Sequence, residues 1–294
     1  MENGKNVVQF YPAKDFKIPI DCLTQTIFST DFTNGNIVET EIVESKKRGI
    51  KSKITIINNS GAPLTEFDRA VLNAAITEIA NGNTTFSANI IFHHLGGGRN
   101  LPENMRRAIL DSFDKLSLIR VTIEAEQACK KKIIDLDPAF KGTFKGYVLP
   151  TESLIATING QTIDAIHSLK KGVSFFNSDL RDQIITCSQE LLQAPIKATP
   201  RNIALNHYLL RRALSIKGSR EKAVENKHVN PLSKSINIDE LLKHCGVEYN
   251  RDRQKRILTV TKKILQFLIE KNIIKNFTFE TKKGGKFSSI ILEF

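Results

Sequence analysis

Residues 64–97 read LTEFDRAVLNAAITEIANGNTTFSANIIFHHLGG, and this stretch decides the fold. Thr65 followed by Asp68 resembles a capping box with Asp in place of the usual Glu or Gln, so we expect a helix to begin here. The helix should end near Asn81 and Gly82. Its apolar side chains recur at helical spacing and share one face: Phe67, Val71, Leu72, Ala75, Ile76 and Ile79.

Two more helices and several strands are expected downstream. Ser87 can cap a short helix over residues 88–95, which the glycines at 96–98 would end. A third helix should run from near Pro102 to about Lys115 and bury Met105, Ile109, Leu110 and Phe113. Strand-like segments then cover residues 118–125, 146–149, 153–158 and 162–169. Helix, short helix, helix and hairpin is the order of a winged helix-turn-helix.

The same order recurs in the last third of the chain. Residues 201–217 have the apolar spacing of a helix, and the polar stretch 218–235 is expected to be a loop. A short helix over 238–245 and a long helix over 251–271 should follow. Residues 273–294 read as a hairpin with a basic, glycine-rich tip. Two copies of one order predict tandem winged-helix domains.

The remaining segments are expected to lie around these two copies. Residues 36–44 and 51–58 alternate like the strands of a hairpin, and residues 173–192 resemble a linking helix and loop. The predicted fold class is therefore α+β, with two tandem winged helix-turn-helix domains and an N-terminal β-rich extension. The expected boundaries are 1–60 for the extension, 61–172 for the first domain, 173–196 for the linker and 197–294 for the second, strongly basic domain.

Length and composition agree with a two-domain globular protein. The chain has 294 residues, of which 40% are apolar and 25% are charged. It contains no run of the roughly 18 apolar residues that a membrane helix needs, and MENGKNVVQFYPAKDF lacks a signal-peptide pattern, so a cytoplasmic location is expected. The cysteines are far apart and should be isolated, mostly buried thiols rather than disulfides or zinc ligands: Cys22, Cys129, Cys187 and Cys245.

The net charge of +12 is concentrated at one end of the chain. Residues 197–294 contain 21 Lys and Arg against 9 Asp and Glu, so residues 1–196 are neutral overall. A one-sided positive field attracts polyanions, and phosphate contacts supply most sequence-independent nucleic-acid affinity. DNA or RNA is therefore the leading partner. A basic surface kept for solubility is the alternative, and an anionic membrane is less favoured.

The candidate DNA-binding residues cluster on two elements of the second domain. The third helix of a helix-turn-helix enters the major groove, where Arg can pair with guanine and Lys mostly contacts phosphates. We expect Arg251, Arg253 and Arg256 to read base edges, and Lys255 lies in the same turn and a half of the helix. Lys262 and Lys263 should contact the DNA backbone. The hairpin tip would place Lys282, Lys283 and Lys286 along an adjacent phosphate run or minor groove.

The first domain offers fewer cationic side chains. The candidates before or at the start of its third helix are Arg99, Asn100, Asn104, Arg106 and Arg107, and Lys130, Lys131 and Lys132 follow the strand expected to open its hairpin. The neutral balance of this half fits either weaker DNA contact or a protein–protein surface.

The sequence carries no recognisable catalytic signature. A phosphate-binding Walker loop needs Gly-Lys-Ser or Gly-Lys-Thr, whereas the glycines at 96–98 are followed by Arg99 and Asn100. His93 and His94 are adjacent and point about 100° apart in a helix, which is unlike a metal-binding pair. Tyr249 suits packing or phosphate contact better than nucleophilic attack. We expect no enzymatic activity, no cofactor and no metal.

Three runs resemble replication initiator proteins of plasmids and mobile elements, which have tandem winged-helix domains. They are residues 64–97 quoted above, the connector QIITCSQELLQAPIKATPRNIALNHYLLRRALSIKG, and RQKRILTVTKKILQFLIEKNIIKNF near the C-terminus. The resemblance covers roughly residues 65–294 and rests on pattern and helix order. It implies binding of repeated origin DNA, local melting, recruitment of the host helicase or initiator, and homodimer formation through the first winged-helix domain.

Other functions fit the same residues. A helicase-loading or primosome adaptor would use DNA only as a nonspecific surface, and a transcriptional repressor could share the whole fold. RNA binding is less favoured because no strand is rich in aromatic side chains for stacking on bases, although Phe277 and Phe279 are candidates.

Overall fold

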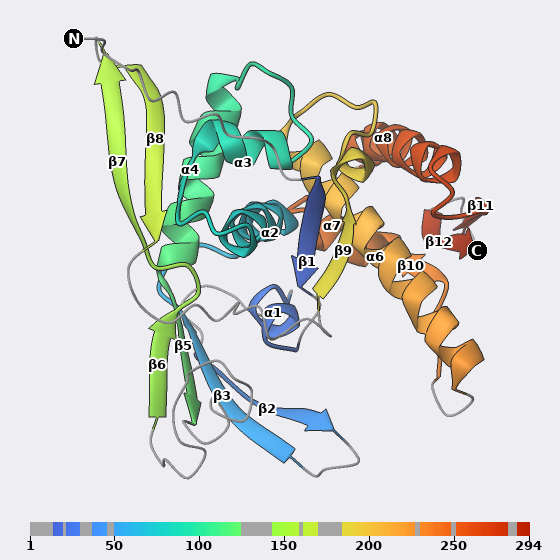
Figure 1. The fold of residues 1–294 in the computed structure, drawn as a ribbon. Coiled ribbons are helices and arrows are strands. Elements are labelled where there is room, and N and C mark those ends of the chain that lie inside the picture. The colour runs from blue at the N-terminus through green and yellow to red at the C-terminus, as the bar shows by residue number, and fades with distance from the viewer. Residues whose placement is uncertain are drawn as a thin grey trace.

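The computed structural model describes residues 14–19, 22–29, 37–45, 50–124, 143–158, 161–169, 184–226, 230–247, 251–281 and 287–294. Helices and small antiparallel sheets alternate along this part of the chain, so the expected α+β class is confirmed (Figure 1). None of the helices in these ranges combines the length and the apolar character needed to cross a membrane.

The first unit is built around three helices. Helix α2 (Glu66–Ala80) begins with the expected capping box, in which Thr65 and Asp68 bond to each other's backbone. Strand β4 (Thr85–Ser87) leads into α3 (Ala88–His94), where the Ser87 hydroxyl accepts a hydrogen bond from the Ile90 amide. Helix α4 (Glu103–Ser117) follows. Strands β7 (Thr151–Ile158) and β8 (Gln161–Leu169) form a hairpin, and β8 also pairs with β4.

The strand after α4 does not belong to that hairpin, which corrects the sequence prediction. Strand β5 (Ile119–Glu124) lies between β3 (Ile50–Asn58) and β6 (Thr143–Tyr147), and β2 (Ile37–Ser45) completes the sheet in the order β2-β3-β5-β6. Alternating β-branched residues identify a strand but not its partner, and here β3 offers the matching edge. Lys130, Lys131 and Lys132 follow β5 and lie outside the described residues.

The second unit repeats the order of the first except that, in the described part of the chain, no strands of another sheet lie between its third helix and its hairpin. It consists of α6 (Pro200–Glu225), β10 (Ser235–Asn237), α7 (Ile238–His244), α8 (Arg251–Glu270), β11 (Asn276–Thr281) and β12 (Phe287–Glu293). As in the first unit, the short strand pairs with the last strand of the hairpin, in the order β10-β12-β11. Helix α6 continues to Glu225, so the loop expected from residue 218 starts later. Gly218 is tolerated inside the helix because good helix formers, Arg220 to Lys222, follow it.

A two-stranded sheet joins the N-terminal region to the segment between the units. Strand β1 (Asp15–Pro19) pairs with β9 (Ile184–Ser188), and the 3-10 helix η2 (Gln189–Leu192) follows. Residues 184–192 were expected to contribute to a linking helix and loop, and this expectation is wrong. The β-branched run at 184–186 favours an extended chain, which buries Phe16 and Ile18 of β1 against the core. The short helix α1 (Cys22–Ile27) lies next in sequence to β1.

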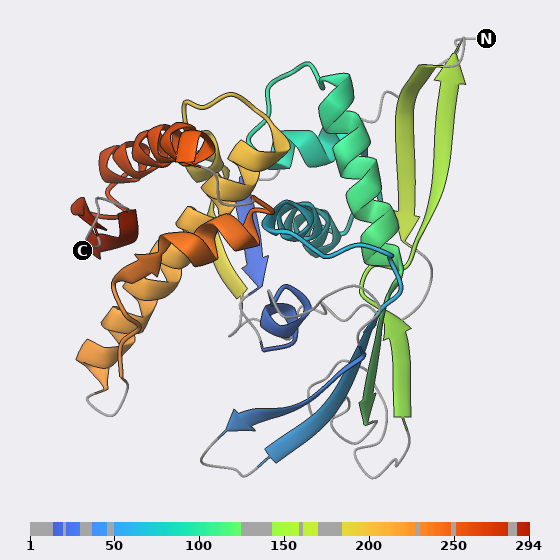
Figure 2. The ribbon, with the colours of Figure 1, turned by 180° about the vertical axis from the view of Figure 1, so that it is seen from behind.

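Helix α2 lies at the centre of the molecule, with other elements on all of its sides (Figure 2). It packs against α4, α6, α3 and β1, and the buried apolar residues of both units form one continuous core. The sequence predicted burial of a single apolar stripe, whereas polar residues of α2 are buried as well. They have partners: Asp68 accepts from the Ser112 hydroxyl at 2.7 Å, and Glu78 bonds to the His94 ring.

Cysteine placement agrees with the sequence where it is described. Cys187 and Cys245 are buried free thiols. Burial raises the pKa of Cys187 to about 12, so this thiol is inert at neutral pH. The side chain of Cys22 and all of Cys129 lie outside the described part of the chain.

A buried ion pair connects the two units through their first helices. Arg211 of α6 donates from Nε to Glu66 Oε1 at 3.0 Å and from Nη2 to Glu66 Oε2 at 2.9 Å. The two side chains are only 6% and 1% exposed. Burial would raise the pKa of Glu66, but the charges of Arg211 and Arg69 and the hydrogen bonds from Arg211 together outweigh it, so the pKa lies below its usual range. Arg211 also lies over the Tyr208 ring, 5.2 Å from its centroid.

Removing one member of this pair should be costly. In Arg211→Met, the buried Glu66 carboxylate loses its hydrogen-bonded partner and keeps only the Arg69 charge nearby, and we expect the free energy of unfolding to fall by about 3 kcal/mol in urea titrations. The double variant Glu66→Leu with Arg211→Met removes both charges and should recover most of that loss. Equal losses in the single and double variants would show that the ion pair is not the stabilising contact.

His207 should make the fold sensitive to acid. Its ring is buried, neither ring nitrogen has a hydrogen-bond partner among the described residues, and burial lowers its pKa from 6.5 to about 4. The unfolded chain takes up this proton near pH 6.5, whereas the folded chain does so only near pH 4. The folded state should therefore lose about 3 kcal/mol as the pH falls through that window.

The matched variant is His207→Phe, which keeps a ring beside Phe16, whose centroid lies 5.4 Å from that of His207. Urea titrations at pH 7 and pH 4.5 should give a smaller difference in stability for this variant than for the parent chain. An unchanged difference would assign the acid sensitivity to other groups.

Candidate nucleic-acid interface

Helix α8 presents a row of cationic side chains on its outward face. Its apolar side is buried against the rest of the second unit and includes Ile257, Ile264, Leu265 and Leu268. The exposed positions recur at helical spacing: Lys255, Arg256, Thr259, Lys262, Lys263, Gln266 and Glu270. Within the described part of the chain, no salt bridge pairs any of the four cations with a carboxylate. These four cations are exposed on one face of the helix, the basic face of α8.

Aromatic residues of the hairpin pack against one another, and one of them contacts α8. Phe279 lies edge-to-face with Phe277 and with Phe287, at centroid separations of 5.7 and 5.6 Å. The Lys262 ammonium lies over the Phe279 ring, 5.6 Å from its centroid. The cation–π contact therefore links Lys262 of α8 to β11 of the hairpin.

The predicted residues of the second unit divide into three groups. Lys255, Arg256, Lys262 and Lys263 are brought together on the exposed face of α8. Arg251 and Arg253 lie in the first turn of the same helix, and their side chains lie outside the described part of the structure. Lys282, Lys283 and Lys286 fall in residues 282–286, between the described parts of β11 and β12.

The corresponding face of the first unit is mixed in charge. Arg99, Asn100, Asn104 and Arg107 are exposed, but Arg106 is mostly buried and its Nε lies 3.5 Å from Glu103. Asp111 and Asp114 are exposed on the same side of α4 as Asn104 and Arg107. Partial burial of the carboxyl group, and then the nearby Asp111 charge, raise the pKa of Asp114 although its side chain is exposed. These carboxylates make the surface of α4 much less suited to a phosphate backbone than that of α8.

The turn before the third helix uses glycine in both units. Gly96 follows α3 with φ 83°, and Gly246 follows α7 with φ 63°, a conformation that favours glycine. A Cβ at Gly96 would overlap the Leu192 carbonyl, and one at Gly246 would lie 3.2 Å from Thr65 Cγ2. The turn at Gly96 therefore packs against the segment that joins the units, and the turn at Gly246 packs against the start of α2.

His93 and His94 do not form a metal site with their neighbours. His94 is buried, and its ring bonds to Glu78 and lies 3.4 Å from Gln189 Oε1. His93 is half-buried, and burial lowers its pKa. In the described ranges, no group of three His, Cys, Asp or Glu side chains could hold a metal ion. Tyr249 lies outside those ranges.

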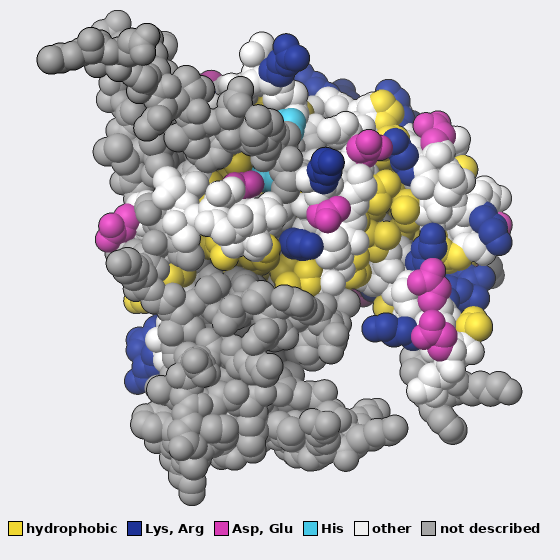
Figure 3. Space-filling model, in the orientation of Figure 1, with side chains coloured by type: hydrophobic (Ala, Val, Ile, Leu, Met, Phe, Trp, Pro, Cys, Tyr) yellow, Lys and Arg dark blue, Asp and Glu magenta, His cyan; other side chains and the backbone are white. Residues whose placement is uncertain are grey.

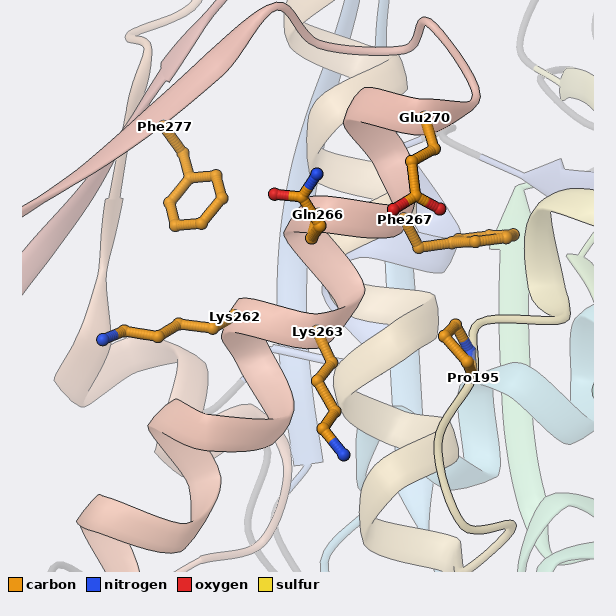
Figure 4. Close-up of a pocket in the computed structure, with 7 residues that line it drawn as sticks. All are labelled: Pro195, Lys262, Lys263, Gln266, Phe267, Glu270 and Phe277. Atoms are coloured by element: carbon orange, nitrogen blue, oxygen red, sulfur yellow. The ribbon is translucent and has the colours of Figure 1, made fainter.

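Sequence reasoning missed a groove over the C-terminal half of α8 (Figure 4). Its volume is about 550 Å³. The residues that line it come from α8, from β11 and from the loop after η2: Pro195, Lys262, Lys263, Gln266, Phe267, Glu270 and Phe277. The sequence signal for it was the aromatic residue Phe277 at the start of the hairpin.

The solved structures that are similar to this chain include crystal structures of RctB domains. No protein-family model matches the chain, and no curated protein sequence does. A crystal structure of a selenomethionine derivative of domains 2 and 3 of RctB is 14% identical, with a TM-score of 0.40, and the match covers 92% of this chain and 98% of that one. A second crystal structure of RctB domains 2–3 is 12% identical, with a TM-score of 0.40 and coverage of 90% and 94%.

Proposed function

We propose that this chain binds duplex DNA through α8 and the hairpin β11–β12. The observation that carries the proposal is the row of Lys255, Arg256, Lys262 and Lys263 on the outward face of α8. All of the net positive charge of the chain lies in the same region, residues 197–294. Exposed cations on one helix face supply the phosphate contacts from which protein–DNA affinity largely arises.

In this proposal each unit is a winged helix-turn-helix. The support is the repeated order of helix, short strand, short helix, long helix and hairpin, with the short strand paired to the last strand. In such a motif the helix after the turn enters the major groove, and its N-terminal residues meet the base edges. In α8 these residues are Arg251, Arg253, Lys255 and Arg256, while Lys262 and Lys263 contact phosphates. Lys282, Lys283 and Lys286 of the hairpin tip contact the adjacent backbone.

The first unit serves mainly protein contact in this proposal. Asp111 and Asp114 on the face of α4 would repel phosphates, and residues 1–196 carry no net charge. Formation of a homodimer through this unit, which the resemblance to plasmid initiators implies, fits that surface.

The biological role that we propose is replication initiation without enzymatic activity. It rests on the resemblance of residues 65–294 to replication initiators of plasmids and mobile elements. The chain would bind origin repeats and recruit host replication proteins. An adaptor that loads a helicase would share the basic face but would not require a specific DNA sequence.

Selection of duplexes from a random DNA pool at two salt concentrations tests this role. We expect recovery of a sequence motif, repeated at the spacing of a helical turn, because the third helix reads base edges. Salt-sensitive binding without any motif would contradict the initiator role and favour the adaptor.

Lysine variants test the docking surface. Lys262→Ala with Lys263→Ala should weaken binding to every duplex and reduce the slope of log affinity against log salt by about two. Arg256→Ala should cost about 1–3 kcal/mol on the selected site and less on other DNA. The matched control is Lys145→Ala, an exposed lysine on β6 of the other sheet, which should leave both quantities unchanged. Affinities are measured by fluorescence anisotropy, and equal effects of the control and the α8 variants would refute the docking model.

A further inference from the structure

The groove over the C-terminal half of α8 has two apolar walls. Phe277 of β11 stands on one side of the helix, and Phe267 stands with Pro195 on the other (Figure 4). The exposed side chain of Gln266 lies between the two walls. Both walls offer carbon surface, and Gln266 offers an amide between them. A groove of this kind gains most from a ligand that inserts apolar side chains.

The two ends of the groove carry opposite charges. Lys262 and Lys263 lie at the end nearer the start of α8, and Glu270 lies at the other end. The contact of Lys262 with the Phe279 ring holds its ammonium close to the Phe277 wall. Figure 3 shows hydrophobic side chains exposed among Lys, Arg, Asp and Glu side chains in the part of the surface formed by α6, α8 and the C-terminal hairpin. A ligand with carboxylates near one end and apolar side chains next to them complements this arrangement.

Duplex DNA fits this groove poorly. Recognition helices contact bases with their N-terminal residues, and the groove begins only at Lys262, in the second half of α8. Protein–DNA interfaces are polar and strongly positive, whereas this groove has aromatic walls and includes the Glu270 carboxylate, which repels phosphates. The N-terminal half of α8 is therefore available to DNA, and the groove is available to another ligand.

We propose that this groove binds an acidic peptide segment of a partner protein. The segment inserts apolar side chains between Phe277 and Phe267, and its carboxylates pair with Lys262 and Lys263. Charge complementarity supports this partner over a basic or purely apolar segment. Since the two lysines also face the proposed DNA surface, the peptide and the duplex share part of their binding sites.

The test uses Gln266→Trp, which fills the groove from an exposed helix position without removing a core contact. Its matched control is Thr259→Trp, two helical turns earlier on the same exposed face and outside the groove. The probe is a displayed library of random short peptides, selected on the full-length chain. Selected peptides are then synthesised with a fluorophore, and their affinities for the parent and variant chains are measured by anisotropy.

We expect the selected peptides to be rich in Asp, Glu and large apolar residues. Gln266→Trp should weaken their binding at least about tenfold, and so should Lys262→Glu with Lys263→Glu, whereas Thr259→Trp should change it by less than about twofold. Duplex affinity, measured on the same proteins, should fall more in Thr259→Trp than in Gln266→Trp.

Two results would overturn the proposal. One is a selection that yields no binder, or only binders that Gln266→Trp leaves unaffected. The other is a loss of duplex affinity in Gln266→Trp as large as that in Thr259→Trp, which would assign the groove to the DNA surface. Either result can be told apart from a failure of the DNA-binding proposal, because Arg256→Ala tests that proposal at a residue outside the groove.

Discussion

The bidentate ion pair between Glu66 and Arg211 is the contact on which the arrangement of the two units depends. Both charges are withdrawn from water, and a buried charge is tolerated only while its partner stays in place. Glu66 begins α2 and Arg211 lies near the middle of α6, so the pair holds the first helices of the two units in one relative position. Apolar contacts alone would allow α2 and α6 to slide along each other. Two directional hydrogen bonds fix the position of one helix relative to the other.

The position of the basic face follows from that register. Helix α6 packs against α2 and also against α8. On the other side, the turn at Gly246 before α8 lies close to Thr65, the cap of α2. The start of α2 thus contacts both the helix that supports α8 and the turn that precedes it. A change in the junction between the units would therefore alter the orientation of the surface that we propose for DNA.

Much of the local structure could be predicted from the sequence, because it depends on neighbouring residues. The cap at Thr65, the cap at Ser87 and the outward spacing of Lys255, Arg256, Lys262 and Lys263 follow directly from helix geometry. The pairing of β5 with β3 and that of β1 with β9 could not be predicted, because alternation identifies a strand without naming its partner. Glu66 and Arg211 are 145 positions apart, and a polar residue at a helix start normally suggests exposure. The groove escaped prediction because Pro195 and Phe277 reach α8 from separate segments.

The most direct test of the central claim is hydrogen–deuterium exchange of the full-length chain with and without a selected duplex. If α8 is the DNA-binding helix, peptides that cover residues 251–270 should exchange more slowly when the duplex is bound, while peptides that cover α4 should exchange at the same rate. Slower exchange over α4 with no change over residues 251–270 would contradict DNA binding by α8 and place the DNA on the first unit.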